Sequence, residues 1–303
     1  MALAAILLCL PFSSAARGQA QPPPQKDRIR VEVNLVNIIA GVLDQKGRPA
    51  PNLPKDAFEL YEEGVRQKIE VFEAETQQPL DLTLMIDSSL STYKEFEFER
   101  EAAAHFIRQV VRPGDRLAVF EFSDSVTQLT DFSADVPLLQ AAVRRMEEGA
   151  GTALYDAILL GAQALGRRPA GRRRVIVLVT DAGETTSQAK FDQARRAAVL
   201  AEAMIYSVII RPVKSESGRN TAGEHALITI TEAAGGAMYF PDTMADLDPI
   251  FDRIDRELRT QYRLGYYPEP RPPARSYRRV EVRVKGDYVV HARQGYFSSG
   301  APE

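Results

Sequence analysis

Oxygen-bearing side chains cluster directly after an apolar segment of the chain. Residues 82–86 read Leu-Thr-Leu-Met-Ile, and Asp87, Ser89 and Ser91 follow at alternate positions. The apolar run has the length and composition of a buried strand. Carboxylate and hydroxyl oxygens are hard ligands of the kind that Mg²⁺ prefers. The segment therefore predicts part of a metal site in the loop that follows the strand.

Two later segments supply matching oxygens. Thr152 directly precedes a predicted helix over residues 153–165, and Asp181 comes just after the apolar run of residues 175–179. In an open parallel sheet, ligands gather at the carboxyl ends of the strands, which is where these side chains are expected. The predicted set of metal ligands is Asp87, Ser89, Ser91, Thr152 and Asp181.

The charge of this set favours binding over catalysis. Only two of the five residues, Asp87 and Asp181, are carboxylates. They neutralise a +2 ion formally without surrounding it with excess negative charge. The ion would then still attract a carboxylate from a partner molecule. We therefore expect a binding protein and not an enzyme.

Each part of the set also has a simpler interpretation. Ser89 and Ser91 together, or Thr152 by itself, are residue types that cap helices, and Asp181 is a common turn residue. All of them in chain order, each at the expected end of its element, favour the metal site. For two nearby acids, Asp156 and Glu184, a structural or solvated role is favoured.

From residue 79 to residue 261, short apolar strands alternate with amphipathic helices. This alternation predicts an α/β domain with a doubly wound, mostly parallel sheet covered on both faces. The predicted strands are 82–86, 117–122, 126–132, 175–179, 205–210 and 238–240, and the predicted helices are 96–110, 136–146, 153–165, 191–203, 226–234 and 247–259.

Short strands with turn signals precede and follow this domain, over residues 28–78 and 262–298. Neither segment is long enough to bury a core easily by itself. Together they are expected to form one small β-sandwich into which the α/β domain is inserted, an arrangement that works when a domain's ends lie close together. The tyrosines at positions 262, 266, 267, 277, 288 and 296 are interpreted as sandwich core or cross-strand pairs.

The N-terminus has the pattern of an export signal. Residues 3–10 are apolar, and Gly18 and Ala20 form a small-x-small cleavage site, so residues 1–20 are predicted to be removed. Residues 21–27 form a proline-rich spacer. The one cysteine, Cys9, lies inside the apolar run and not at the cleavage point, so no lipid anchor is expected. We expect a secreted, periplasmic or cell-envelope protein with no integral membrane segment after cleavage.

The overall charge gives no general attraction to nucleic acid, because the formal net charge is −3. One basic cluster, with arginines at 167, 168, 172, 173 and 174, precedes the apolar run of residues 175–179. No aromatic residues are interleaved with it to stack on bases. It is interpreted as a solvated face, and no nucleic-acid partner is expected.

The complete oxygen pattern resembles the metal-ion-dependent adhesion site of von Willebrand factor type A domains. Residues 149–158 and 175–181 are similar to that family, and residues 42–49, 58–64, 261–267 and 293–296 resemble secreted bacterial proteins related to it. The resemblance implies a Rossmann-like fold and a bound Mg²⁺, Mn²⁺ or Ca²⁺. Leu90 and Ala182 depart from the pattern, since glycine is common at both positions.

The resemblance also implies a role for each residue. Ser89, Ser91 and Thr152 would ligate the ion directly, whereas Asp87 and Asp181 would act directly or through water. A carboxylate of a protein partner would occupy the open position.

Two other functions remain open at this point. The first is a scaffold whose metal site is not functional, and the second is a Mg²⁺-dependent hydrolase. Phosphotransferases of the haloacid dehalogenase type also place an aspartate after the first strand, but they need a second one two residues later, where this chain has Ser89. No G-x-S-x-G, H-E-x-x-H or P-loop pattern occurs.

Overall fold

The computed structural model describes residues 35–74, 78–89, 96–210, 221–273 and 275–298. These residues fall within one compact unit that begins at Asn34. The predicted signal peptide, the spacer, residues 28–34 of the first sandwich segment, and Ser91 lie outside the described residues. In the described part of the chain, no helix is both long and apolar enough to cross a membrane.

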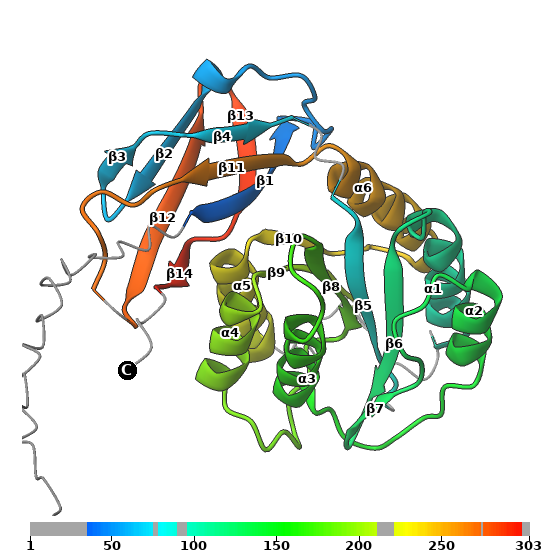
Figure 1. Cartoon of the computed structure of the whole chain (residues 1–303). Coiled ribbons are helices and arrows are strands. Elements are labelled where there is room, and N and C mark those ends of the chain that lie inside the picture. Colours follow the sequence, from blue (N-terminus) through cyan, green and yellow to red (C-terminus); the bar gives the residue numbers. More distant parts are fainter. Residues whose placement is uncertain (1–34, 75–77, 90–95, 211–220, 274, 299–303) are drawn as a thin grey trace, which may run out of the picture. The chain divides into compact units, whose positions relative to one another are not determined.

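A six-stranded sheet forms the centre of the α/β domain (Figure 1). Its strand order is β10-β9-β8-β5-β6-β7, and every neighbouring pair is parallel except the β6–β7 hairpin. The central strand β5 is buried along its whole length, including its polar residues Asp81, Thr83 and Asp87. The strands are β5 (Leu80–Asp87), β6 (Arg116–Phe122), β7 (Val126–Gln128), β8 (Arg173–Thr180), β9 (Ala203–Ile209) and β10 (Gly236–Tyr239).

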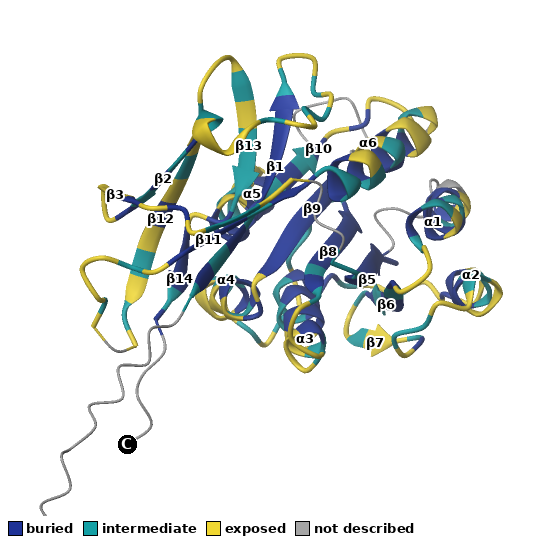
Figure 2. Ribbon diagram, turned by 45° about the horizontal axis from the view of Figure 1, so that its top comes forward, coloured by how far each residue is buried: buried dark blue, intermediate teal, exposed yellow. Residues whose placement is uncertain are grey.

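Helices cover both faces of this sheet. One apolar core joins the sheet to α1 (Phe96–Val110), α2 (Val136–Arg144) and α6 (Leu247–Arg259). A second core joins the opposite face to α3 (Leu154–Gly166), α4 (Phe191–Leu200) and α5 (Thr221–Ala234). Figure 2 shows the inner strands β5, β8 and β9 almost wholly buried, whereas the edge strand β7 is exposed. The predicted doubly wound α/β fold is confirmed.

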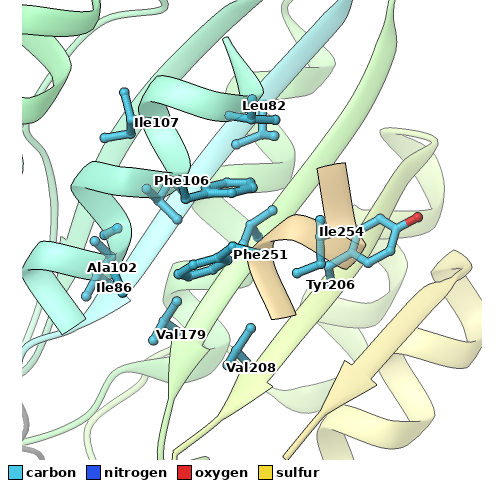
Figure 3. Close-up of a cluster of buried hydrophobic side chains, with 14 of the residues drawn as sticks. Leu82, Ile86, Ala102, Phe106, Ile107, Val179, Tyr206, Val208, Phe251 and Ile254 are labelled. Atoms are coloured by element: carbon cyan, nitrogen blue, oxygen red, sulfur yellow. The ribbon is translucent and has the colours of Figure 1, made fainter. Parts of the chain in front are cut away.

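Alternation along β5 divides its side chains between the two cores. Leu82, Leu84 and Ile86 belong to the first, and Met85 belongs to the second. In the first core the rings of Phe106 and Phe251 stack with their centroids 4.7 Å apart, and Figure 3 shows them among the apolar side chains of this core.

Several predicted boundaries are wrong: β7 ends at Gln128 and not at residue 132, and α5 begins at Thr221 and not at residue 226. The helix expected over residues 191–203 ends at Leu200, and Ala203 already begins β9. Glu202 between them has a φ of 54°, in the left-handed region, which helical residues do not adopt. Apolar residues continue through this turn, so periodicity alone does not reveal it.

The two terminal segments form one β-sandwich, as the sequence predicts. In the first sheet, with order β13-β1-β11-β4, β1 lies between two strands from beyond residue 261. The second sheet has the order β14-β12-β2-β3. The members are β1 (Val36–Asp44), β2 (Phe58–Glu62), β3 (Val65–Gln67), β4 (Val71–Glu73), β11 (Tyr262–Tyr266), β12 (Tyr277–Val284), β13 (Tyr288–Ala292) and β14 (Gly295–Phe297), and two 3₁₀ turns lie at Lys55–Ala57 and Met244–Asp246.

The sandwich core contains residues from both ends of the chain. Phe58 contacts Tyr262 with ring centroids 4.8 Å apart, and Tyr266 and Tyr296 lie in the same apolar cluster. The core role is therefore confirmed for Tyr262, Tyr266 and Tyr296, and Tyr277 makes a cross-strand contact with Phe297, but Tyr267 is exposed and its predicted role is wrong. Since the α/β domain lies in sequence between the two halves of this core, it is an insertion.

A buried carboxylate stabilises the sandwich from within. Glu62 is 2% exposed and accepts hydrogen bonds from the hydroxyls of Tyr266, at 2.7 Å, and Tyr296, at 3.2 Å. Its other oxygen accepts from Nε of Arg278 at 2.8 Å. Burial, together with the nearby Glu62 charge, raises the pKa of both tyrosines. This network joins one strand from the N-terminal segment to three strands from the C-terminal segment.

Replacing Glu62 with leucine should lower the free energy of unfolding by about 3–5 kcal/mol, because it leaves a guanidinium and two hydroxyls without their acceptor. Urea unfolding followed by far-UV circular dichroism measures the change. Glu281→Leu is the matched control: its ion pair with Arg283 is half exposed and should contribute less than about 1 kcal/mol. Equal losses in the two variants would contradict a buried network.

Candidate metal centre

The candidate site lies at the carboxyl ends of the two central strands. Asp87 is the last residue of β5 and Thr180 is the last residue of β8. The two strands pair in parallel, with Ile86 opposite Val179, so their ends meet. The Thr180 hydroxyl donates a hydrogen bond of 2.6 Å to Oδ2 of Asp87, which has no exposed surface.

Ser89 is tied to the same carboxylate. Its backbone N–H donates to Oδ1 of Asp87 at 3.0 Å, and its side chain is buried with it. An isolated parallel bridge joins Ser89 to Gly149, and Gly149 N–H donates to the carbonyl of Ser88. These contacts connect the loop after β5 to the segment that leads into α3.

Thr152 enters the site from the segment before α3. The N-cap of that helix is Ala153, and no side chain caps it, so Thr152 is not an N-cap residue. Its backbone is held to Thr185: Thr152 N–H donates to the Thr185 hydroxyl, and Thr185 N–H donates to the Thr152 carbonyl. The position of Thr152 is therefore set by the loop that follows β8.

Asp181 and Thr152 direct oxygens at the same small space. A Cβ atom added to Gly183 would lie 2.9 Å from Oδ1 of Asp181 and 3.1 Å from Oγ1 of Thr152. Gly183 N–H also donates to that Asp181 oxygen at 2.7 Å. The absence of a side chain at residue 183 thus keeps the two oxygens accessible to a common ligand.

Ala182 shows why glycine is common at its position. Its φ is 65°, in the left-handed region, which costs a non-glycine residue roughly 1 kcal/mol or more. Ala182 N–H donates to the Thr180 hydroxyl, and the methyl group is buried in the core shared with α3 and α4. The loop makes the required turn with alanine in place.

Burial raises the pKa of Asp87 to about 6. Hydrogen bonds from Thr180 and Ser89 partly offset this rise, and the nearby charge of Asp181 adds to it. An ionised Asp87 in this position is poorly solvated and lies near a second carboxylate. Such a pair, flanked by hydroxyl groups, has the donor chemistry of a site for a small hard cation. In the described part of the chain no cluster of three or more histidine, cysteine or acidic residues suits a metal.

Four of the five predicted ligands therefore lie at one end of the sheet, and Ser91 is outside the described residues. Asp156 and Glu184 have the structural role that the sequence suggested. Asp156 accepts hydrogen bonds from Gln188 N–H and Ala189 N–H. Glu184 accepts from the hydroxyl of Ser187. Both acids order the loop after β8.

Two contributors were missed in the sequence. Thr180 follows the predicted strand of residues 175–179 and was not included in the predicted ligand set, although its hydroxyl links β8 to Asp87. Asp124, after β6, accepts a hydrogen bond from Ala150 N–H and so positions the segment that carries Thr152. Polar residues at strand ends were the available signal. Their partners depend on strand register, which the sequence does not show.

Residues 82–184 match the family model of the von Willebrand factor type A domain. The match runs from β5 through the loop after β8 and so includes every described candidate ligand. The chain contains a von Willebrand factor type A domain. The sequence has no significant match among curated proteins.

Solved structures share the fold. A von Willebrand factor type A protein from Catenulispora acidiphila is 13% identical with a TM-score of 0.51, and the alignment covers 88% of this chain and 74% of that one. The D319A mutant of the PilB minor pilin from Streptococcus sanguinis is 12% identical with a TM-score of 0.51, and the coverage is 61% and 62%. Proximal thread matrix protein 1 from the mussel byssus is 15% identical with a TM-score of 0.50, and the coverage is 61% and 50%.

The raised pKa of Asp87 predicts a pH-dependent stability in the absence of divalent cations. The folded state favours the protonated acid, so the stabilising contribution is complete below the usual pKa of 3.8 and is lost as the pH rises through about 6. The loss should reach about 3 kcal/mol. Asp87→Asn cannot ionise, and its carbonyl oxygen still accepts from Ser89 N–H.

In EDTA, the unfolding free energy of Asp87→Asn minus that of the unmodified protein should therefore increase as the pH rises from 4 to 7. Denaturant unfolding at several pH values measures the difference. Asp192→Asn, at an exposed position, is the control and should show no such trend. A constant difference between Asp87→Asn and the unmodified protein would show that Asp87 does not titrate in this range.

Proposed function

We propose that this protein is an exported binding module that captures an acidic group of a protein partner through a divalent cation. The observation that carries the proposal is the buried Asp87 carboxylate, which is joined to Thr180 and Ser89 at the strand ends where Asp181 and Thr152 also lie. This is a donor set for a cation, and it lies at the end of the sheet where ligands of open α/β folds bind.

Each residue has a distinct part in the proposal. Ser89, Ser91 and Thr152 would hold the ion through neutral hydroxyls, and Asp87 and Asp181 would supply its countercharge directly or through water. When bound, Mg²⁺, or Mn²⁺ or Ca²⁺ in its place, supplies an electrophilic position that attracts a partner carboxylate. Neutral hydroxyl ligands leave that position more attractive to an anion than a set of carboxylates would.

The neighbours and the fold support an extracellular binding role. A minor pilin and a matrix protein of the mussel byssus have similar folds. The signal-like N-terminus agrees with export to the envelope or beyond. A phosphotransferase of the haloacid dehalogenase type needs a carboxyl group as general acid two residues after the first aspartate. At that position this chain has Ser89, whose backbone N–H donates to Asp87 and whose side chain has no carboxyl group.

Divalent cations should stabilise the folded protein. A concentration of Mg²⁺ one hundred times the dissociation constant should raise the free energy of unfolding by about 2.7 kcal/mol. The double variant Asp87→Ala, Ser89→Ala should lose this response. Thermal unfolding at increasing Mg²⁺ measures it, and an equal response in both proteins would remove the metal site from consideration.

A glycine pair offers a sharper version of the same test. Gly183→Ala places a methyl group against Asp181 and Thr152 and should weaken Mg²⁺ binding by roughly tenfold or more. Gly166→Ala, near the end of α3, meets nothing within 4 Å and should leave Mg²⁺ binding unchanged. If both variants bind Mg²⁺ like the unmodified protein, the ion does not lie between Asp181 and Thr152.

The partner should be retained only while the cation is present. Immobilised protein is exposed to an envelope extract in Mg²⁺ and eluted with EDTA, with Gly183→Ala as the control surface. Amidation of the carboxyl groups of the eluted partner should then abolish its rebinding. Rebinding that persists in EDTA, or after amidation, would favour a scaffold whose metal site is not functional.

A further inference from the structure

The arginine cluster around the start of β8 is not the solvated face that its sequence suggests, because only Arg167 among its members is exposed. Arg173 is 5% exposed, and Arg168 and Arg172 both pair with Asp81, which has no exposed surface. The cluster lies at the amino end of β8, whereas the candidate metal centre is at the carboxyl end. Seven residue steps of about 3.3 Å separate the two ends of the strand, so the two regions are roughly 20 Å apart.

A cavity of about 350 Å³ lies beside this cluster. Residues of the von Willebrand factor type A domain and of the β-sandwich line it together. Its lining is strongly basic, with five arginines and one acid. The charged lining residues are Arg172, Arg173, Arg174, Arg263, Arg293 and Glu202.

Two of these arginines have no carboxylate partner among the described residues. Arg173 donates to the carbonyls of Gln78 and Leu258 and to the side-chain oxygen of Gln261. Arg174 donates to backbone carbonyls only. Neutral dipoles therefore compensate two buried or half-buried positive charges. Burial, and to a lesser extent the nearby charge of Arg259, lower the pKa of Arg173 to about 10, and the carboxylate of Asp115 partly offsets this.

The two sandwich arginines are balanced by acids at the rim. Arg263 lies 3.4 Å from Glu73, and Arg293 lies 2.9 Å from Glu202. Both acids are largely solvent-exposed, at 44% and 57% of the side chain, so water screens these pairs.

The cavity residues also contain buried donors without an acceptor. The Nε–H groups of Arg174, Arg263 and Arg293 are buried and meet no hydrogen-bond acceptor in the part of the chain that the structure describes. Buried donors in folded proteins nearly always have a partner. Five arginines line one cavity, and two of them have no carboxylate partner among the described residues, so the lining favours an anionic ligand with several acceptor oxygens.

We propose that this cavity binds a phosphate group. A phosphate dianion offers acceptor oxygens in several directions, which suits guanidinium groups that approach from two different domains better than a planar carboxylate does. A cavity of about 350 Å³ also has room for a small organic phosphate monoester. Because Arg174 belongs to β8 and Arg263 to β11, the bound phosphate connects the inserted domain to the sandwich.

The test is a titration of the full chain with inorganic phosphate. It is done in EDTA, at an ionic strength held constant with sodium chloride, so that the metal centre does not contribute. Calorimetry and thermal unfolding should show saturable binding and a rise in melting temperature. Arg174→Gln and Arg263→Gln should each weaken binding at least tenfold, whereas Arg271→Gln, at an exposed position outside the cavity, should not change it.

An equal phosphate response in all four proteins would overturn the proposal, as would the absence of saturable binding in the unmodified chain. If Arg174→Gln does not fold, Arg263→Gln decides, because that side chain is 21% exposed and has only the screened pair with Glu73 to lose. Circular dichroism verifies the fold of each variant.

A second series identifies the source of the phosphate. Glucose 6-phosphate that binds more tightly than inorganic phosphate indicates an organic monoester, and equal binding indicates the free anion. Sodium acetate at the same concentration should not compete, and competition equal to that of phosphate would contradict the proposal. Loss of Mg²⁺ binding in the Asp87→Ala, Ser89→Ala variant should leave phosphate binding intact, so the two sites can fail independently.

Discussion

The parallel pairing of β5 with β8 is the constraint on which the candidate site depends. It brings Asp87 and Thr180 to the same edge of the sheet, where a 2.6 Å hydrogen bond joins them. Both strands are buried on two faces, so neither can shift by one residue without turning apolar side chains out of the cores. The packing of apolar residues therefore determines where the polar ones meet. The sheet positions Asp87 and Thr180, and the loop after β8 then positions Thr152.

The acid at the end of β5 is held in a state that the fold alone does not favour. Asp87 has no exposed surface, and its pKa is raised to about 6 by burial. A fold selected for stability alone would replace such a residue with a neutral one. Buried ionisable groups whose pKa is shifted by desolvation and a nearby like charge are common at functional sites. Gly183 also favours a functional site, because it leaves space beside the oxygens of Asp181 and Thr152.

Polar contacts also connect the inserted domain to the sandwich. Glu257 of α6 accepts a hydrogen bond from the hydroxyl of Tyr206 on β9 and lies 2.8 Å from Nδ1 of His291 on β13. Gly41 of β1 packs against the same carboxylate, and a Cβ atom there would lie 2.4 Å from it. The sandwich is thus joined to the inserted domain by specific side chains as well as by the two chain crossings. The basic cavity lies at the same junction, because residues of the inserted domain and of the sandwich both line it.

Local pattern in the sequence was enough to predict the alternation of strands and helices, the doubly wound sheet and the positions of Asp87, Ser89, Thr152 and Asp181 at element ends. These features depend on residues close together in the chain, whose periodicity follows from strand and helix geometry. The pairing of the two terminal segments was also predictable, because neither could bury a core by itself.

Tertiary structure decided what surrounds these residues. The role of Thr180 depends on the register between strands that are more than ninety residues apart. The burial of Arg173 depends on contacts with Leu258 and Gln261, and charged residue types suggested the opposite. Desolvation and long-range hydrogen bonding are properties of the packed molecule. They have no counterpart in local sequence pattern, so the basic cavity and the raised pKa of Asp87 could be recognised only from the fold.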